Sequence, residues 1–153
     1  MIDINAKIIK SFDRVAKATK RASDRVLRCS GAYVRKVVQN SIKRGKIKDG
    51  KEVNSEPGNP PFYWQQPGLN FKKSILFAVD SINESVVVGP IAKGYNKIGN
   101  LHEFGGSQKV KVVDRETGKE KSVMATYPAR PFMAPGLEKS QDKLAEFWEN
   151  SIR

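Results

Sequence analysis

Few side chains in this sequence combine the type and the spacing that acid–base, nucleophilic or metal chemistry requires. His102 is the only histidine among 153 residues, so a histidine-based metal cluster is impossible and a Ser-His-Asp arrangement would have to use this residue. The pair His102-Glu103 also lacks the second histidine of a zinc-protease helix. We therefore expect neither an enzyme nor a bound metal or cofactor. We interpret His102 as a partly buried, hydrogen-bonded side chain near a helix terminus.

Patterns that could bind phosphate or react as a thiol are equally weak. The pairs Gly89-Pro90 and Gly105-Gly106 have neither the Walker spacing nor the dinucleotide fingerprint of a phosphate-binding loop. Cys29 is the single cysteine, which excludes an internal disulfide and fits synthesis in a reducing compartment. Because Cys29 falls on an apolar helix stripe, we expect it to be an inert core residue.

A rigid backbone is predicted for the segment 127–137. It contains three prolines within eight residues, which are Pro128, Pro131 and Pro135. Each proline fixes its own φ and biases the residue before it toward an extended conformation. Residues 127–133, which we name the strap, therefore present Arg130, Phe132 and Met133 in a form suited to docking. We expect Arg130 to bind a carboxylate, either across an interface or within its own subunit.

Positive charge is concentrated at the start of the chain, whose net charge is +12. Residues 1–48 contain 14 Lys and Arg against three Asp, whereas residues 49–153 contain 14 Lys and Arg against 13 Asp and Glu. The candidate basic face comprises Arg14, Lys17, Arg21, Arg25 and Arg28. A solvated helix surface, contact with an acidic protein and contact with nucleic-acid phosphates all fit this face, and the sequence leaves the three open.

The same segment shows clear helical periodicity. Apolar or small side chains alternate spacings of three and four at Ile4, Ile8, Phe12, Val15, Thr19, Ala22, Val26, Cys29, Tyr33 and Val37. This apolar stripe predicts a long amphipathic helix. We expect a break near Ser30-Gly31, and glycines from Gly45 to Gly50 must end the helix.

The segment 49–72 is predicted to form an extended arm, because it lacks periodicity and contains a proline-glycine cluster. It also holds three consecutive aromatic residues, Phe62, Tyr63 and Trp64. Such side chains are difficult to leave in water. We expect them either to fold back onto their own core or to insert into a neighbouring subunit.

Two antiparallel hairpins are predicted, the first pairing 73–80 with 85–89 across Asn83-Glu84, the second pairing 109–113 with 120–124. A short helix should lie between them and stop at Gly105-Gly106.

The resulting fold class is α+β, with a long N-terminal helix and a C-terminal helix packed on a small antiparallel sheet. We expect one domain, 1–153. Its predicted parts are a basic helical segment (1–48), the extended arm (49–72), the sheet with its short helix (73–133) and a C-terminal helix (134–153).

Three motifs in order resemble those of the neck and tail-completion proteins of long-tailed bacteriophages. The first is Pro57-Gly58-Asn59-Pro60-Pro61, followed by Gly68-Leu69 and Lys72-Lys73-Ser74-Ile75. The second is Leu101-His102-Glu103-Phe104-Gly105-Gly106, and the third runs from Pro128 through Arg130-Pro131-Phe132 to Leu137. The basic N-terminal helix and the C-terminal helix also fit, so the resemblance spans essentially the whole chain.

The resemblance implies a structural virion protein of the neck, made in the host bacterial cytoplasm. Such a protein assembles with itself as a six- or twelve-fold ring around the DNA channel. Its partners would be the head-side connector and the tail tube or tail terminator proteins, with non-specific contact to channel DNA allowed. We expect no membrane association, because no apolar run approaches the roughly 20 residues of a membrane span.

A ring needs a heterologous interface that closes by rotation. We expect its two sides to be the aromatic arm, with Phe62, Tyr63 and Trp64, and the strap, with Arg130, Phe132 and Met133. The alternative function is a free-standing basic protein that binds nucleic acid through the N-terminal helix.

Overall fold

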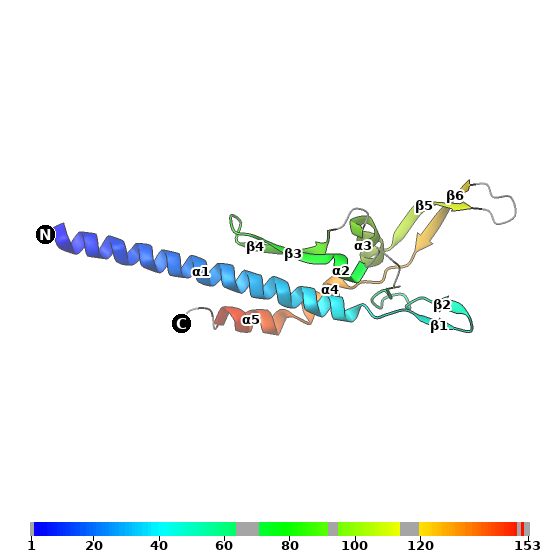
Figure 1. Cartoon of the computed structure of the whole chain (residues 1–153), viewed down its shortest axis with the longest axis horizontal. Coiled ribbons are helices and arrows are strands. Elements are labelled where there is room, and N and C mark those ends of the chain that lie inside the picture. The colour runs from blue at the N-terminus through cyan, green and yellow to red at the C-terminus, as the bar shows by residue number, and fades with distance from the viewer. Residues whose placement is uncertain (1, 64–70, 92–94, 114–119, 150, 152–153) are drawn as a thin grey trace.

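The computed structural model describes residues 2–63, 71–91, 95–113, 120–149 and 151, with the side chains of 2–11, 95 and 96 left aside. In chain order the elements are α1 (Ile2–Ser41), β1 (Lys46–Lys48), β2 (Lys51–Val53), α2 (Phe71–Ser74), β3 (Ile75–Asp80), β4 (Ser85–Pro90), α3 (Tyr95–Phe104), β5 (Gly106–Val113), β6 (Glu120–Tyr127), α4 (Met133–Glu138) and α5 (Gln141–Glu149). The hairpin β3–β4 and the helices α4 and α5 lie along α1, whose N-terminal part extends beyond them, and the ribbons β1–β2 and β5–β6 project past its C-terminal end (Figure 1). The expected α+β class is confirmed.

The helix α1 is continuous over 40 residues, so the expected break at Ser30-Gly31 was wrong. At Gly31 the hairpin β3–β4 crosses the helix, and an added Cβ would lie 2.6 Å from both Phe77 and Val86. Glycine in a helix interior costs about 1 kcal/mol relative to alanine, and this close approach offsets the cost. Gly31 is therefore a packing position and not a helix terminus.

The buried face of α1 differs from the predicted stripe. The core consists of Val34, Val38 and Ile42 from α1 together with Ile75 and Phe132. These three helix positions follow the 3.6-residue period on a face next to the stripe. The reason is that β3–β4 and α4 both pack on this side of the helix.

The predicted stripe divides into two parts. Its C-terminal part faces α5, where the rings of Tyr33 and Phe147 meet edge to face at 5.9 Å between centroids. Its N-terminal part is exposed, with Phe12 at 72% and Val15 at 63% of their surface accessible. Cys29 is exposed as well, so its assignment to the core was wrong.

The strands form three separate two-stranded antiparallel ribbons instead of one sheet. Both predicted hairpins are confirmed: β3 pairs with β4 from Ile75↔Pro90 to Asp80↔Ser85, and the ribbon β5–β6 is longer than expected. Glu84 adopts a positive φ of 48° in the first turn, and the Asp80 carboxylate accepts hydrogen bonds from the backbone there. The ribbon β1–β2, around Asp49-Gly50, was not predicted.

Side chains of α1 attach the helix to the start of β3. The carbonyl oxygen of Ile75 accepts hydrogen bonds from Arg35 Nε at 3.0 Å and from Gln39 Nε2 at 3.0 Å. A strand's first carbonyl is thereby satisfied by a neighbouring helix, as a partly buried polar group requires.

The part of the extended arm around Tyr63 is folded back onto its own subunit. The backbone N–H of Gly45 donates to the carbonyl of Tyr63, and the N–H of Tyr63 donates to the carbonyl of Lys43, each at 2.9 Å. Tyr63 also packs against the core. Of the two alternatives for the aromatic arm, folding onto its own core holds for Tyr63. Trp64 lies outside the described residues.

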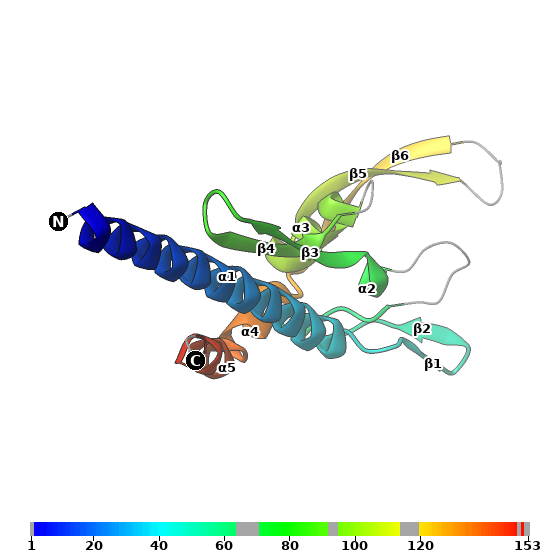
Figure 2. The same cartoon turned by 60° about the vertical axis from the view of Figure 1, so that its left-hand side comes forward.

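The C-terminal segment forms two helices that pack against α1, not the single predicted helix 134–153 on a sheet. The chain turns at Lys139 and Ser140, and the buried Ser140 hydroxyl donates to the carbonyl of Gly136. Gly136 sits directly on α1, because a Cβ added there would overlap the side chain of Val38. Two views, Figure 1 and Figure 2, show α4 and α5 beside the C-terminal half of α1.

Replacing Gly136 by alanine is expected to lower the free energy of unfolding by about 1–2 kcal/mol, because overpacking against Val38 exceeds the gain in helix propensity. Urea denaturation would measure the change. The matched control is Gly89→Ala, because an added Cβ at Gly89 meets no atom within 4 Å. Equal stability of the two variants would contradict the close contact between α4 and α1.

Candidate functional site

The strap is tied down within its own subunit by Arg130. Its Nε donates to the carbonyl oxygen of Ser55 at 2.8 Å, and its backbone N–H donates to the carbonyl of His102. The intramolecular alternative for Arg130 therefore holds, although the acceptors are backbone carbonyls and not the expected carboxylate.

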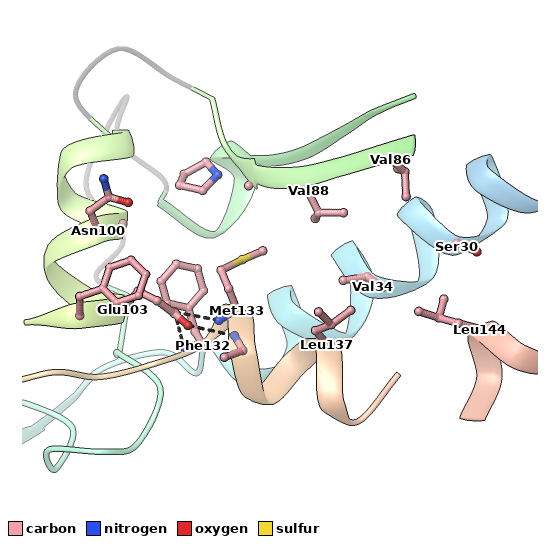
Figure 3. A pocket seen from close by; sticks show the side chains of 15 residues that line it. Ser30, Val34, Val86, Val88, Asn100, Glu103, Phe132, Met133, Leu137 and Leu144 are labelled. Atoms are coloured by element: carbon pink, nitrogen blue, oxygen red, sulfur yellow. Dashed lines mark hydrogen bonds between the residues drawn. The ribbon is translucent and has the colours of Figure 1, made fainter. Parts of the chain in front are cut away.

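Glu103 caps the helix α4 from a distant point in the chain. One carboxylate oxygen accepts the backbone N–H groups of Phe132 and Met133, and the other accepts that of Ala134, each at 2.9 Å. Figure 3 shows these bonds as dashed lines between α3 and the start of α4. The first N–H groups of a helix lack intrahelical partners and carry partial positive charge, so a carboxylate is well suited to this position.

The sequence analysis did not assign this role to Glu103. Capping residues are normally found next to the helix that they cap, whereas Glu103 lies about 30 positions earlier in the chain. The only local sign of this role was that Glu103 is a carboxylate within the second motif, Leu101 to Gly106.

Gly105 allows the end of α3 to meet the strap closely. Gly105 has a φ of 70°, and a Cβ there would lie 2.9 Å from the backbone nitrogen of Ala129 and from the carbonyl oxygen of Tyr127. A larger residue would be strained in this left-handed conformation and would clash with backbone. The predicted stop of the short helix at the glycine pair is confirmed.

His102 is half-buried near the end of α3, as expected, with its ring 5.6 Å from that of Phe71. Burial lowers the pKa of His102, and the positive charge of Arg130 lowers this pKa further. The neutral imidazole is therefore the form that the folded protein favours.

A pH prediction follows for His102. An unfolded histidine takes up a proton near its ordinary pKa of about 6.5, whereas the folded protein resists this until lower pH. The unfolded state then binds more protons, so stability should fall as the pH decreases from 7.5 toward 5.5. Melting temperatures measured across this range should fall less in His102→Gln, because the chain has no other histidine. An identical fall in the variant would contradict the assignment.

An apolar groove of about 540 Å³ lies beside the capped helix α4, and we refer to it below as the groove. Its lining residues come from five elements and the strap: Ser30, Val34, Val86, Val88, Gly89, Pro90, Gly99, Asn100, Glu103, Phe104, Phe132, Met133, Ala134, Leu137 and Leu144. Figure 3 shows Val86 and Val88 of β4 on one side, with Val34, Leu137 and Leu144 on the other. Glu103 is the only charged side chain among the described lining residues.

The rim of the groove is unusually apolar for a protein surface. Phe104 is 78% exposed and Leu137 49%, and both line the groove. Exposed apolar side chains scattered singly are ordinary, but a contiguous set around a concave site marks a binding surface. Since both oxygens of Glu103 already accept hydrogen bonds, the groove is suited to holding apolar side chains.

The residues expected at the subunit interface lie in different environments in the structure. Phe132 is 1% exposed and belongs to the core, so its assignment to a partner contact was wrong. Met133 is half-buried and lines the groove, which leaves it available to a partner. Phe62 and Tyr63 are half-buried within their own subunit.

The candidate basic face is present on the surface of α1. Arg14, Lys17, Arg21, Arg25 and Arg28 are all exposed, and the ion pairs recorded within the described part of the chain involve none of them. Their charge is therefore available to an anionic partner.

The ribbon β1–β2 adds a second basic surface that the sequence analysis missed. Lys48 stands directly opposite Lys51, and Lys46 lies two residues before Lys48 on the same face. Like charges directly opposite each other destabilise a strand pair. All three lysines are exposed and therefore accessible to a partner. The negative charge of an anionic partner would relieve their repulsion.

Comparison of the chain with protein-family models, curated proteins and solved structures finds no match. Within the described ranges, no three His, Cys, Asp or Glu side chains gather in a way that could hold a metal ion. The helices described here include none with the length and apolar character that crossing a membrane requires. The surface geometry is therefore the basis for a functional proposal.

Proposed function

We propose that this protein is a structural component of the neck of a long-tailed bacteriophage, forming a ring that joins head and tail around the DNA channel. The observation that carries the proposal is that the subunit leaves two apolar surfaces uncovered, the groove and the part of α1 around Phe12 and Val15. Burial of apolar surface is the main favourable contribution to association. A chain that keeps such surfaces open on projecting elements is suited to assembly.

The convergence of the three resemblance motifs supports the neck assignment. The N–H of Gly58 in the first motif donates to the carbonyl of Ala129 in the third at 2.9 Å. The second motif joins the third through Glu103 and through the carbonyl of His102. Residues that are far apart in the sequence thus form one structural unit, which fits a shared fold better than three coincidental matches.

The two basic surfaces are consistent with a position beside channel DNA or an acidic ring. They also favour the second candidate, a free-standing protein that binds nucleic acid. Phosphate contacts would make duplex binding steeply dependent on salt concentration. Titration of duplex DNA at 50 and 200 mM salt separates the two, because tight and salt-sensitive binding by the isolated protein would favour the second candidate.

Electron microscopy of particles from a phage that lacks this gene tests the proposal. We expect DNA-filled heads and complete-looking tails to accumulate separately. Normal tailed virions in the absence of the protein would overturn the neck role.

Neutralising the basic face should block joining without unfolding the protein. The fourfold variant Arg14→Gln, Arg21→Gln, Arg25→Gln and Arg28→Gln is expected to lower the yield of joined particles by at least about tenfold, since several charge contacts are lost together. Counting of joined particles on micrographs provides the measurement. The control carries lysine at the same four positions and should join normally, and normal joining by the glutamine variant would contradict a role for the face.

A further inference from the structure

We propose that the free half of α1, residues 2–21, lies in the groove of the next copy of the chain. This inference deepens the ring assembly proposed above and rests on it, because it names the surfaces through which neighbouring copies meet. Each copy would donate a helix to one neighbour and accept a helix from the other. Such a heterologous contact closes into a ring when its rotation divides a full turn.

The free half of α1 has the properties of a helix that lacks its partner. Every residue from 12 to 21 is exposed, including Phe12 and Val15. An isolated helix of this length is marginally stable in water and depends on tertiary packing of its apolar face. Phe12, Val15 and Thr19 follow the spacing with which helices insert anchors into apolar grooves.

The groove has the shape and the lining to accept such a helix. Its floor is formed by Ser30 and Val34 of α1, and its walls are formed by β4 and by α4 with α5. Ser30 and Val34 are only 7% and 6% exposed, so the side chains of a docked helix, and not its backbone, would reach this floor. Met133 also lines the groove and offers a side chain that adapts to the shape of a partner.

The helix and the groove of one chain cannot meet each other. Val34, which lies in the groove, and Phe12, which lies on the free half, belong to the same continuous helix. Twenty-two residues of helix separate them by about 33 Å at 1.5 Å per residue. Because a straight helix cannot fold back on itself, the free half of α1 cannot fill the groove of its own chain, and in this inference it fills the groove of another copy.

Charge favours this pairing as well. Residues 2–21 contain six Lys and Arg against two Asp. Among its described lining residues, the groove has one acidic side chain, Glu103, and no basic one. Attraction between a basic helix and a slightly acidic groove raises the rate of association and favours one orientation of the docked helix.

A peptide-binding experiment tests the inference. The probe is a fluorescent peptide of residues 2–22, and the receptor is the full-length chain with Phe12→Asp and Val15→Asp, whose own helix no longer competes. We expect saturable binding by fluorescence anisotropy. Adding Leu137→Arg to the receptor should weaken the affinity at least about tenfold, a loss of about 1.4 kcal/mol.

Two matched controls make the result specific. Val112→Arg in the receptor changes an apolar residue of the ribbon β5–β6 with 48% exposure, against 49% for Leu137, and should leave the affinity unchanged. A peptide carrying Phe12→Asp should not bind. Circular dichroism melting of each receptor variant confirms that it is folded.

Several outcomes would overturn the inference. Binding that persists in Leu137→Arg, binding that is lost in Val112→Arg, or association of the peptide only with itself would each place the free helix elsewhere. If the wild-type protein joins heads to tails but the peptide ignores the groove, the interface is wrong and the neck role stands. If the peptide binds as expected but the protein joins no particles, the interface stands and the neck role is wrong.

Discussion

Replacing Phe132 by alanine is expected to lower the free energy of unfolding by about 3–5 kcal/mol, the range for truncating a buried aromatic side chain. Phe132 is 1% exposed at the point where the strap meets the core. Its ring lies 5.4 Å from that of Phe71 in an edge-to-face arrangement. Urea denaturation of the isolated protein would show the loss as a lower midpoint with an unchanged slope.

Met133→Ala is the matched control for this prediction. Met133 is the next residue along the strap, but it is only half-buried and faces the groove. Its truncation should cost about 1–2 kcal/mol in stability, less than for a fully buried side chain. If Phe132→Ala kept the stability of the wild type and lost only assembly, Phe132 would belong to an interface and its place in the core would be wrong.

Replacing Glu103 by alanine should lower the free energy of unfolding by about 2–4 kcal/mol. Three backbone N–H groups at the start of α4 would lose their acceptor, and leaving partly buried donors unsatisfied costs about 1–3 kcal/mol for each group that water does not reach. The loss of the favourable charge at the helix terminus adds to this cost. Thermal or urea denaturation would measure the change.

The variant Glu103→Gln separates hydrogen bonding from charge. Its amide offers one carbonyl oxygen where the carboxylate offers two, so we expect roughly half the loss of the alanine variant. Glu120→Ala serves as a surface control, because Glu120 pairs with Lys111 in an exposed ion pair and such pairs contribute little. If Glu103→Ala proved as stable as Glu120→Ala, the capping of α4 would be contradicted.

Elements formed by local sequence were predictable. The hairpins β3–β4 and β5–β6 follow from alternating β-branched residues around turn-forming residues, and the end of α3 follows from Gly105. In each case the information lies within a few residues, because turn chemistry and side-chain periodicity act over short distances. The periodicity of α1 also indicated a long helix, although the break expected at Ser30-Gly31 was wrong.

Features that depend on distant contacts were not predictable. The buried face of α1 is chosen by the ribbons and helices that pack on it, so periodicity alone placed Cys29 in the core. The cap that Glu103 provides for α4 spans about 30 residues, and no local rule connects the two. Arg130 binds within its own subunit, which was one of the two alternatives, but the expected carboxylate acceptor was wrong, because Arg130 donates to the backbone carbonyl of Ser55, 75 residues earlier in the chain.

The groove could not be predicted from the sequence either, because it also depends on contacts between segments that are far apart in the chain. Its lining residues come from five elements that are far apart in the chain, and most of them are apolar residues that a sequence pattern would assign to the core. Only the folded arrangement shows that no described segment of the same chain fills the space. The free half of α1, in contrast, was visible as an apolar stripe, although the sequence did not show that it lacks a partner.

Joining of separated heads and tails by the purified protein is the measurement that tests the central claim most directly. Lysate of a phage that lacks the gene would be mixed with increasing amounts of wild-type protein, and joined particles would be counted on negatively stained grids. We expect joined particles and infectivity to rise together with added protein, and we expect Leu137→Arg to be inactive while Val112→Arg is active. Folded wild-type protein that leaves heads and tails separate would contradict the claim.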